Sequence, residues 1–245
     1  MTAVGVIPAR WESSRFPGKP LTEIAGLPMI QRVWEGARRA KTLRKVIVAT
    51  DDQRIATACR DFGAEVCLTG SQHPTGTDRI AEVAGGLDDE VVVNVQGDEP
   101  LIEGFVIDAA VEALAAAPDV PMATVVHAAS EAALDDPNRV KVALDRRGNA
   151  LYFSRSPIPA RRDLGPAPRI WQHVGLYAYR RSFLLAFVRL ARTPLECAEQ
   201  LEQLRALEHG HTIRCAVVEG WESLAVDVPA DVAPAAAKLA ERERC

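Results

Sequence analysis

The chain has 245 residues, of which 48% are hydrophobic and 25% are charged, and its formal net charge is -4. This size and composition suit a single α/β domain with a sizeable core. Lysine and arginine form no dense run, and no apolar run approaches the ~20 residues of a membrane span, so we expect neither nucleic acid nor a membrane as a partner.

The five cysteines are scattered, odd in number and contain no CxxC pair, which is typical of reduced thiols in a cytoplasmic protein. The N-terminal residues resemble a strand from the start, so we expect no signal peptide. Both features predict a cytoplasmic location.

In the first half of the chain, short apolar runs alternate with helical patterns. Strands are predicted over 4–8, 45–50, 65–68 and 90–95, and helices over 28–40, 53–62, 77–85 and 104–117. This alternation predicts βαβ units in an α/β, Rossmann-like fold with a mostly parallel sheet. The strands are continuously apolar, which indicates burial on both faces.

The pattern changes after Pro118. Strands are predicted over 122–127, 140–144, 150–154 and 172–179, with a hairpin turn at 145–149. We interpret 130–180 as a small antiparallel insertion in one domain that spans 1–245. One helix is predicted over 193–210, where Thr193 and Glu196 form a capping-box pattern, and a strand over 212–218 and an alanine-rich helix from Pro229 follow.

The loop after the first strand holds three cations, Arg10, Arg15 and Lys19. It leaves the carboxyl end of a parallel strand, where open α/β sheets bind ligands. Cations and free backbone N–H groups suit a triphosphate, although a solvated basic loop has the same composition. The loop contains neither GxxxxGK[ST] nor GxGxxG, which disfavours a Walker A site and a dinucleotide oxidoreductase.

Two carboxylates follow predicted apolar strands. Asp98 lies in a turn with Glu99 and Pro100, and Asp227 precedes a helix that begins at Pro229. Carboxylate oxygen is the ligand that magnesium prefers. A cap of the following helix is the structural alternative for Asp98, and an isolated aspartate in the position of Asp227 is more often an N-terminal cap than a metal ligand.

Five segments recur in an order that resembles one family. They are the loop R-x-x-S-x-R-x-P-G-K-P-L over 10–21, TGTDR over 75–79, NVQGDEP over 94–100, YFSR over 152–155 with Ile158 and Pro159, and PLE over 194–196 with LEQLR over 201–205. They are spread in order over nearly the whole chain. The sequence resembles the 3-deoxy-manno-octulosonate (Kdo) cytidylyltransferases, or CMP-Kdo synthetases.

This resemblance implies a fold of the nucleotide-diphospho-sugar transferase type, a homodimer, and Mg²⁺ as the cofactor. It also implies that CMP passes from CTP to the anomeric hydroxyl of a 2-keto sugar acid, Kdo, with release of pyrophosphate, for lipopolysaccharide or related glycan synthesis.

The resemblance also implies residue roles. Those assigned to catalysis are Lys19, Asp98 and Arg10, and those assigned to the metal are Asp98 and Asp227. The nucleotide-binding residues are Pro8, Ala9, Arg10, Ser14, Arg15, Lys19, Thr75, Gly76 and Arg79. The sugar-acid-binding residues are Gln96, Arg155, His173, Glu202 and Gln203.

Several of these residues have ordinary structural alternatives. Arg79 has the position of a helix-surface arginine, a lone histidine on a strand such as His173 is usually structural, and Glu202 and Gln203 fit a solvated helix face. Around Asp227, Val228 and Ala230 replace the threonine and glutamate of the family pattern VDTPEDL.

Two further functions stay open. Trp11 and the shortened loop 161–169 also depart from the family pattern, so 8-amino-Kdo, a sialic acid or a phosphonate remains an alternative acceptor. A non-catalytic nucleotide-binding protein on the same scaffold is the other, because a fold does not fix a function. The joint presence of the cationic loop, both aspartates and Arg155 argues against it.

Overall fold

The computed structural model describes residues 1–12, 16–160 and 169–242. The chain divides into two compact units, one formed by Met1–Asp108 with Ser223–Cys245 and the other by Ala109–Glu222. The C-terminal segment therefore returns to the first unit. The second unit is longer than the proposed insertion over 130–180, and the description of the chain as one domain stays a prediction.

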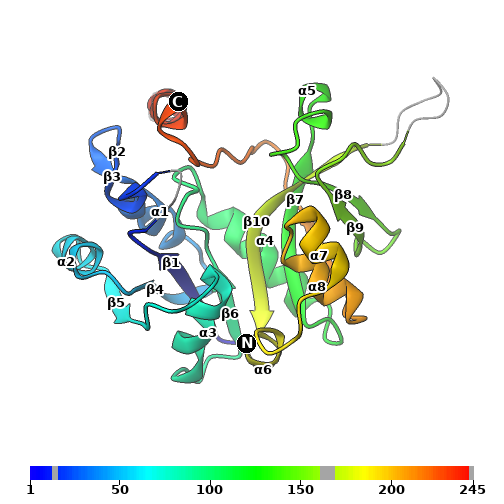
Figure 1. Ribbon diagram of the computed structural model, residues 1–245, viewed down its shortest axis with the longest axis horizontal. Helices are drawn as coiled ribbons and strands as arrows, with labels where there is room; N and C mark the ends of the chain where they lie inside the picture. The colour runs from blue at the N-terminus through cyan, green and yellow to red at the C-terminus, as the bar shows by residue number, and fades with distance from the viewer. Residues whose placement is uncertain (13–15, 161–168, 243–245) are drawn as a thin grey trace. The chain divides into compact units, whose positions relative to one another are not determined.

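The first unit is built on a parallel sheet (Figure 1). Its strands lie in the order β6 (Val91–Asn94), β1 (Ala3–Ala9), β4 (Leu43–Thr50) and β5 (Glu65–Leu68). The helices are α1 (Met29–Ala37), α2 (Gln53–Asp61), α3 (Gly76–Gly85) and the start of α4 (Gly104–Ala115). Most side chains of β1, β4 and β6 are buried, which confirms the expectation drawn from their apolar runs.

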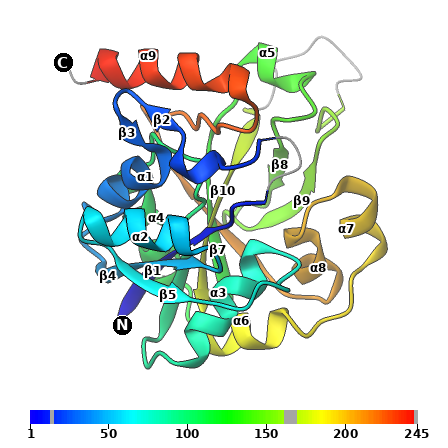
Figure 2. The ribbon, with the colours of Figure 1, turned by 60° about the vertical axis from the view of Figure 1, so that its left-hand side comes forward.

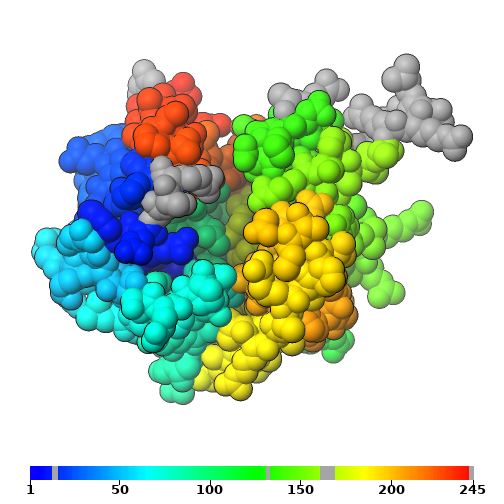
Figure 3. Space-filling view, in the orientation of Figure 1, coloured from blue at the N-terminus to red at the C-terminus, as the bar shows by residue number. Residues whose placement is uncertain are grey.

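A small hairpin and the C-terminal helix complete this unit. Strands β2 (Glu23–Ile24) and β3 (Leu27–Pro28) pair antiparallel, and α9 (Val232–Arg242) lies beside them (Figures 2 and 3). A buried apolar cluster joins these elements and contains Ile24, Met29, Leu101, Val226 and Ala235. Burial of this apolar surface holds the segment that carries Asp227 against the rest of the unit.

The second unit contains a mixed sheet. β11 (Ile213–Val217) pairs parallel with β7 (Met122–Ala128), and β7 pairs antiparallel with β10 (Trp171–Arg180). β10 also pairs antiparallel with β8 (Lys141–Leu144), which forms a hairpin with β9 (Ala150–Ser154). The Asp145 carboxylate accepts the N–H groups of Arg147 and Asn149 at 2.7 and 2.8 Å, which confirms the predicted turn.

The prediction of one helix over 193–210 is wrong. The structure has two short helices, α7 (Pro194–Glu199) and α8 (Gln203–Glu208), separated at Gln200, whose φ is 53°. The buried Glu196 carboxylate binds the Arg205 guanidinium at 2.6 and 2.8 Å. Although burial opposes ionisation, Arg205 keeps the pKa of Glu196 below its usual range. These contacts fold α8 back onto α7, which a straight helix does not allow.

The second unit also contains α5 (Glu131–Leu134) and α6 (Arg181–Phe187), and the first unit contains the short helices η1 (Lys19–Leu21) and η2 (Pro229–Asp231). Within the described part of the chain, no helix is both long and apolar enough to span a membrane. The described cysteines, Cys59, Cys67, Cys197 and Cys215, are free thiols.

Candidate functional site

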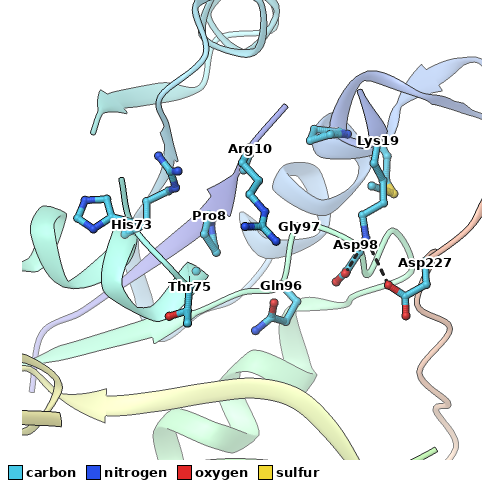
Figure 4. Close-up of a pocket in the computed structure, with 14 residues that line it drawn as sticks. Pro8, Arg10, Lys19, His73, Thr75, Gln96, Gly97, Asp98 and Asp227 are labelled. Carbon is cyan, nitrogen blue, oxygen red and sulfur yellow. Dashed lines mark hydrogen bonds and ion pairs between the residues drawn. The ribbon is translucent and has the colours of Figure 1, made fainter. Parts of the chain in front are cut away.

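A pocket lies in the first unit, where β1 and β6 end at their carboxyl sides (Figure 4). Its lining includes Pro8, Ala9, Arg10, Lys19, Pro20, Met29, His73, Thr75, Gly76, Arg79, Gln96, Gly97, Asp98 and Asp227. The pocket thus collects residues from several loops at the edge of the sheet where parallel α/β proteins bind ligands.

Two glycines allow these loops to approach the end of β1. A Cβ at Gly97 would lie 2.9 Å from the carbonyl oxygen of Pro8, and a Cβ at Gly76 would lie 3.1 Å from the Pro8 ring. Any larger residue at Gly97 would push the following turn away from β1. The glycines therefore set the spacing between Pro8, Thr75 and Asp98.

Lys19 is the centre of the polar part of the pocket. Its Nζ donates to Oδ2 of Asp98 at 2.9 Å and to the carbonyl oxygen of Val226 at 3.0 Å, and it lies 3.5 Å from Oδ1 of Asp227. The structure thus brings together the lysine and both aspartates that were predicted from separate motifs (Figure 4). The ammonium group offsets the repulsion between two neighbouring carboxylates.

The position of Asp227 depends on another carboxylate. Oδ2 of Asp231 accepts the backbone N–H groups of Asp227 and Val228 at 2.8 and 2.9 Å. The N–H of Val226 also donates to the carbonyl oxygen of Asp98 at 2.9 Å. Asp231 therefore caps this turn, while the Asp227 side chain faces the pocket, so the replacements at Val228 and Ala230 leave its placement intact.

Glu99 is a buried acid that the sequence analysis did not assign to the site. It accepts a hydrogen bond from the hydroxyl of Ser223, and so links the turn of Asp98 to the segment of Asp227. Burial raises the pKa of Glu99 to about 7, and the charges of Asp98 and Asp227 act in the same direction.

Arg10 and Arg79 have contrasting environments. Arg10 is exposed, reaches into the pocket in Figure 4, and has no hydrogen bond or ion pair with the rest of the described chain. Arg79 is only 3% exposed, lies 3.3 Å from Asp51, and donates to Thr69 and to the carbonyl oxygen of Gly70. Arg79 is therefore no helix-surface arginine, because it ties the loop before α3 to the end of β4.

Thr75 and His73 lie on the loop that leads into α3. The hydroxyl of Thr75 accepts the N–H of Asp78 at 3.2 Å, so Thr75 is the N-cap of α3. His73 contacts the carboxylate of Glu82, and this contact lowers the pKa of Glu82. His73 was not predicted as a site residue. In the sequence, only its position just before the TGTDR segment pointed to the pocket. Ser14 and Arg15 lie outside the described residues.

Arg155 lies in the second unit at the end of β9. Its guanidinium donates to the carbonyl oxygens of Glu199, Pro137 and Gln200 at 2.8, 2.9 and 3.4 Å. The carboxylate of Glu199 in turn accepts the Ser154 hydroxyl at 2.6 Å and the Arg155 N–H at 2.9 Å. Three of the five guanidinium N–H groups are thus used inside the unit, and these bonds fix the orientation of the plane.

Lys141 is a second cation beside Arg155 that the sequence analysis missed. Its side chain is fully buried and donates to the carbonyl oxygens of Arg155 and Asp136 at 2.6 and 3.0 Å. Burial lowers its pKa. Lys141 therefore holds the backbone on which Arg155 stands.

His173 lies on β10, next to the rings of Phe153 and Tyr177 and the hydroxyl of Thr124. Its Nε2 lies 3.0 Å from the hydroxyl of Thr124, whose single proton is directed to the carbonyl oxygens of Val174 and Leu176. With the hydroxyl proton of Thr124 on its nearest acceptor, the carbonyl oxygen of Leu176, the assigned donor is Nε2 and Nδ1 is the acceptor. Burial lowers the pKa of His173 to about 3, so its ring is neutral near pH 7.

Glu202 and Gln203 lie at the start of α8, but not on a solvated face. Gln203 is 4% exposed, and its Nε2 has no partner among the described atoms. Burial raises the pKa of Tyr177 well above its usual value, and the charge of Glu202 adds to this effect. The ring of Tyr177 lies 5.4 Å from that of His173. The second unit therefore groups His173 with the start of α8. Gln96 lies in the first unit, where it lines the pocket.

Comparisons with known proteins agree with this geometry. The chain matches the cytidylyltransferase family over residues 4–213. It is 51% identical to the 3-deoxy-manno-octulosonate cytidylyltransferase of Geobacter metallireducens, over 98% of both chains. This chain belongs to the 3-deoxy-manno-octulosonate cytidylyltransferase family.

Two further members of the family extend the match. The enzyme of Syntrophotalea carbinolica is 51% identical, with 98% of this chain and 99% of that protein covered. A solved CMP:2-keto-3-deoxy-manno-octonic acid synthetase in complex with CTP superposes with a TM-score of 0.94 at 42% identity, covering 99% of this chain and 100% of the other. The predicted fold class, family and nucleotidyltransferase activity are thereby confirmed.

Proposed function

We propose that this chain transfers CMP from CTP to the anomeric hydroxyl of Kdo and releases pyrophosphate. The observation that carries this proposal is the contact of Lys19 with both Asp98 and Asp227 in a pocket of the first unit, in a chain of the Kdo cytidylyltransferase family. A related synthetase was solved in complex with CTP, which supports the nucleotide assignment.

The reaction forms a bond between the C2 oxygen of the sugar acid and the α-phosphorus of CTP, and breaks the bond to pyrophosphate. Such transfers are catalysed mainly by positioning and by charge stabilisation. Arg10 and Lys19 both line the pocket, which supports a role for the two cations in offsetting the negative charge of the leaving pyrophosphate. Arg15 is proposed for the same role from its motif alone.

Asp98 and Asp227 are the residues that would hold Mg²⁺. A magnesium site in such enzymes needs one or two carboxylates, because phosphate oxygens and waters complete the shell. Both aspartates are partly exposed to the pocket, with side-chain exposures of 29% and 44%, and so fit this requirement. When bound, Mg²⁺ would act as a Lewis acid toward the phosphate and the attacking hydroxyl.

Within the second unit, the acceptor is proposed to bind Arg155, His173, Glu202 and Gln203. Two N–H groups of the Arg155 guanidinium remain for a carboxylate, and a fixed plane favours bidentate binding. Nδ1 of His173 is able to accept a hydrogen bond from a sugar hydroxyl, because Nε2 is directed to Thr124. The buried Nε2 of Gln203 supplies a donor.

We further propose a cytoplasmic homodimer that acts in lipopolysaccharide or related glycan synthesis. These proposals rest on the family to which the chain belongs.

The test is pyrophosphate release from CTP and magnesium, with Kdo, 8-amino-Kdo, a sialic acid and a phosphonate as acceptors. We expect release that depends on both CTP and Kdo, with CMP-Kdo as the second product. Release with another acid but not with Kdo would replace the proposed acceptor and keep the nucleotide chemistry. Absence of release with every acceptor, in a protein that binds CTP, would contradict the proposal.

A further inference from the structure

We propose that Trp11 is a positioning residue for CTP: its ring joins the two ends of the cationic loop, so that Arg10 and Lys19 meet the same phosphates. This inference rests on the proposed function for its ligand and concerns a residue that departs from the family pattern. Trp11 is absent from the lining of the pocket, and it therefore acts through its neighbours.

The first observation is the contact between Trp11 and Gly18. The N–H of Gly18 donates to the carbonyl oxygen of Trp11 at 3.0 Å. A Cβ built on Gly18 would lie 3.2 Å from Cη2 and Cζ2 of the Trp11 ring, so the ring packs directly on the glycine backbone. Gly18 also has φ of 73°, a conformation that glycine adopts without strain. Trp11 and Gly18 are thus joined across the loop by a backbone hydrogen bond and by packing of the ring.

The second observation is that this pair is tied to α2. The guanidinium of Arg54 lies over the Trp11 ring, with Cζ 3.5 Å from the ring centroid. Arg54 is itself held by Asp52 through two hydrogen bonds of 3.0 and 2.6 Å. Asp52 also accepts the N–H of Arg54 at 2.8 Å as the N-cap of α2. A cation over an indole is an attractive arrangement, and here the cation has a fixed position.

Trp11 and Gly18 are the direct chain neighbours of the two cations. Arg10 directly precedes Trp11, and Lys19 directly follows Gly18, and both cations line the pocket. Lys19 has partners of its own in Asp98 and Val226, but the Arg10 side chain has none among the described residues. Strand β1 fixes the backbone before Arg10 and the packing of Trp11 fixes the backbone after it, so Arg10 keeps its place at the pocket. Loss of the ring should impair binding of the phosphates and leave acceptor binding unchanged.

The experiment compares Trp11→Ala and Trp11→Phe with the wild type. CTP and pyrophosphate binding are measured by calorimetry without acceptor, and KM values for CTP and Kdo are measured separately. We expect Trp11→Ala to weaken CTP and pyrophosphate binding by about 10-fold, which is the scale of losing one hydrogen bond between charged groups. KM for Kdo should change by less than about 2-fold, and Trp11→Phe, which keeps an aromatic ring, should recover most of the loss.

Arg54→Ala is the second variant, and Arg38→Ala is its matched control. Arg38 also lies over a tryptophan, with Cζ 4.5 Å from the Trp34 ring, but neither residue lines the pocket. Arg54→Ala should weaken CTP binding and Arg38→Ala should not.

Unchanged CTP binding in folded Trp11→Ala would overturn the inference, and so would an equal rise of KM for both substrates. Because CTP binding is measured without acceptor, a failure of Kdo as the substrate would leave this test intact. If Trp11→Ala does not fold, CTP binding by Trp11→Phe and Arg54→Ala tests the inference. Normal CTP binding in Arg54→Ala would then contradict the proposed positioning role of Trp11.

Discussion

The proposed site residues of the two units differ in their exposure and in their hydrogen-bond partners. In the first unit, Arg10 is exposed and without a described partner, and Lys19 sits between two partly exposed aspartates. In the second unit, Arg155 donates to three backbone carbonyls and His173 lies against Thr124 in a surrounding that keeps its ring neutral. Arg10, a proposed phosphate-binding residue, is thus available to a ligand, whereas the proposed acceptor residues Arg155 and His173 already have partners inside their unit. Mutations of Lys19 or Asp98 in the first unit should mainly change chemistry, and mutations of Arg155 or His173 in the second unit should change chemistry and stability together.

The largest effect is expected at Asp98. Asp98→Asn removes a charge from the proposed metal site and the partner of Lys19, so magnesium-dependent turnover should fall by about 10³-fold. Steady-state rates over a magnesium series provide the measurement, with the exposed Asp88→Asn as the control. Normal turnover with a normal metal dependence in Asp98→Asn would remove this residue from the metal site.

The next effect is expected at Lys19. Lys19→Ala should lower turnover by about 10²-fold, which is the scale of losing one preorganised charge contact. Lys45→Ala is the matched control, because Lys45 pairs with Glu65 at 2.6 Å outside the pocket. Near-normal turnover of a folded Lys19→Ala protein would show that the cation is dispensable.

The next prediction concerns the second unit, where His173 should make the free energy of unfolding depend on pH. His173 has a folded pKa of about 3, below its unfolded value near 6.5, so its contribution to stability is complete above pH 6.5 and is lost as the pH falls toward 3. Between pH 7 and pH 5 this group should cost about 2 kcal/mol of unfolding free energy. Urea titrations of the wild type and His173→Asn over this range measure it. Equal pH slopes in the two proteins would contradict the assigned environment.

The smallest effect is expected at Asp231. Asp231→Ala removes the acceptor for the N–H groups of Asp227 and Val228, which should cost about 1 kcal/mol of stability and about 10-fold in turnover. Asp231→Asn keeps an oxygen acceptor and should lose less of both. Thermal melts and initial rates on the two variants are the measurements. An unchanged rate in Asp231→Ala would mean that the cap does not position Asp227.

Much of the first unit was predictable because its signals are local. Continuous apolar runs identified the parallel strands, and the carboxyl ends of those strands placed Lys19 and Asp98 at one edge. Asp227 was predictable only through its motif, since its place in the pocket depends on the return of the C-terminal segment to this unit.

The missed features depend on side-chain contacts that lie outside the local helix and strand patterns. The break at Gln200 follows from bonds of Glu196 to Arg205 and of Glu199 to Ser154, which override the helical pattern. Glu99 and His73 gained their places from partners 124 and 9 residues away in the chain. Such contacts leave no periodic signal in a single sequence.

The most direct test of the account is the initial rate of CMP-Kdo formation, with CTP and Kdo varied independently, in the wild type, Lys19→Ala and Arg155→Lys. We expect the wild type to form CMP-Kdo and pyrophosphate in equal amounts. Arg155→Lys should raise KM for Kdo by about 10-fold and leave KM for CTP unchanged, because lysine cannot bind a carboxylate in a bidentate manner, whereas Lys19→Ala should lower turnover at saturating Kdo. No CMP-Kdo from the wild type, or equal effects of Arg155→Lys on both KM values, would contradict the account.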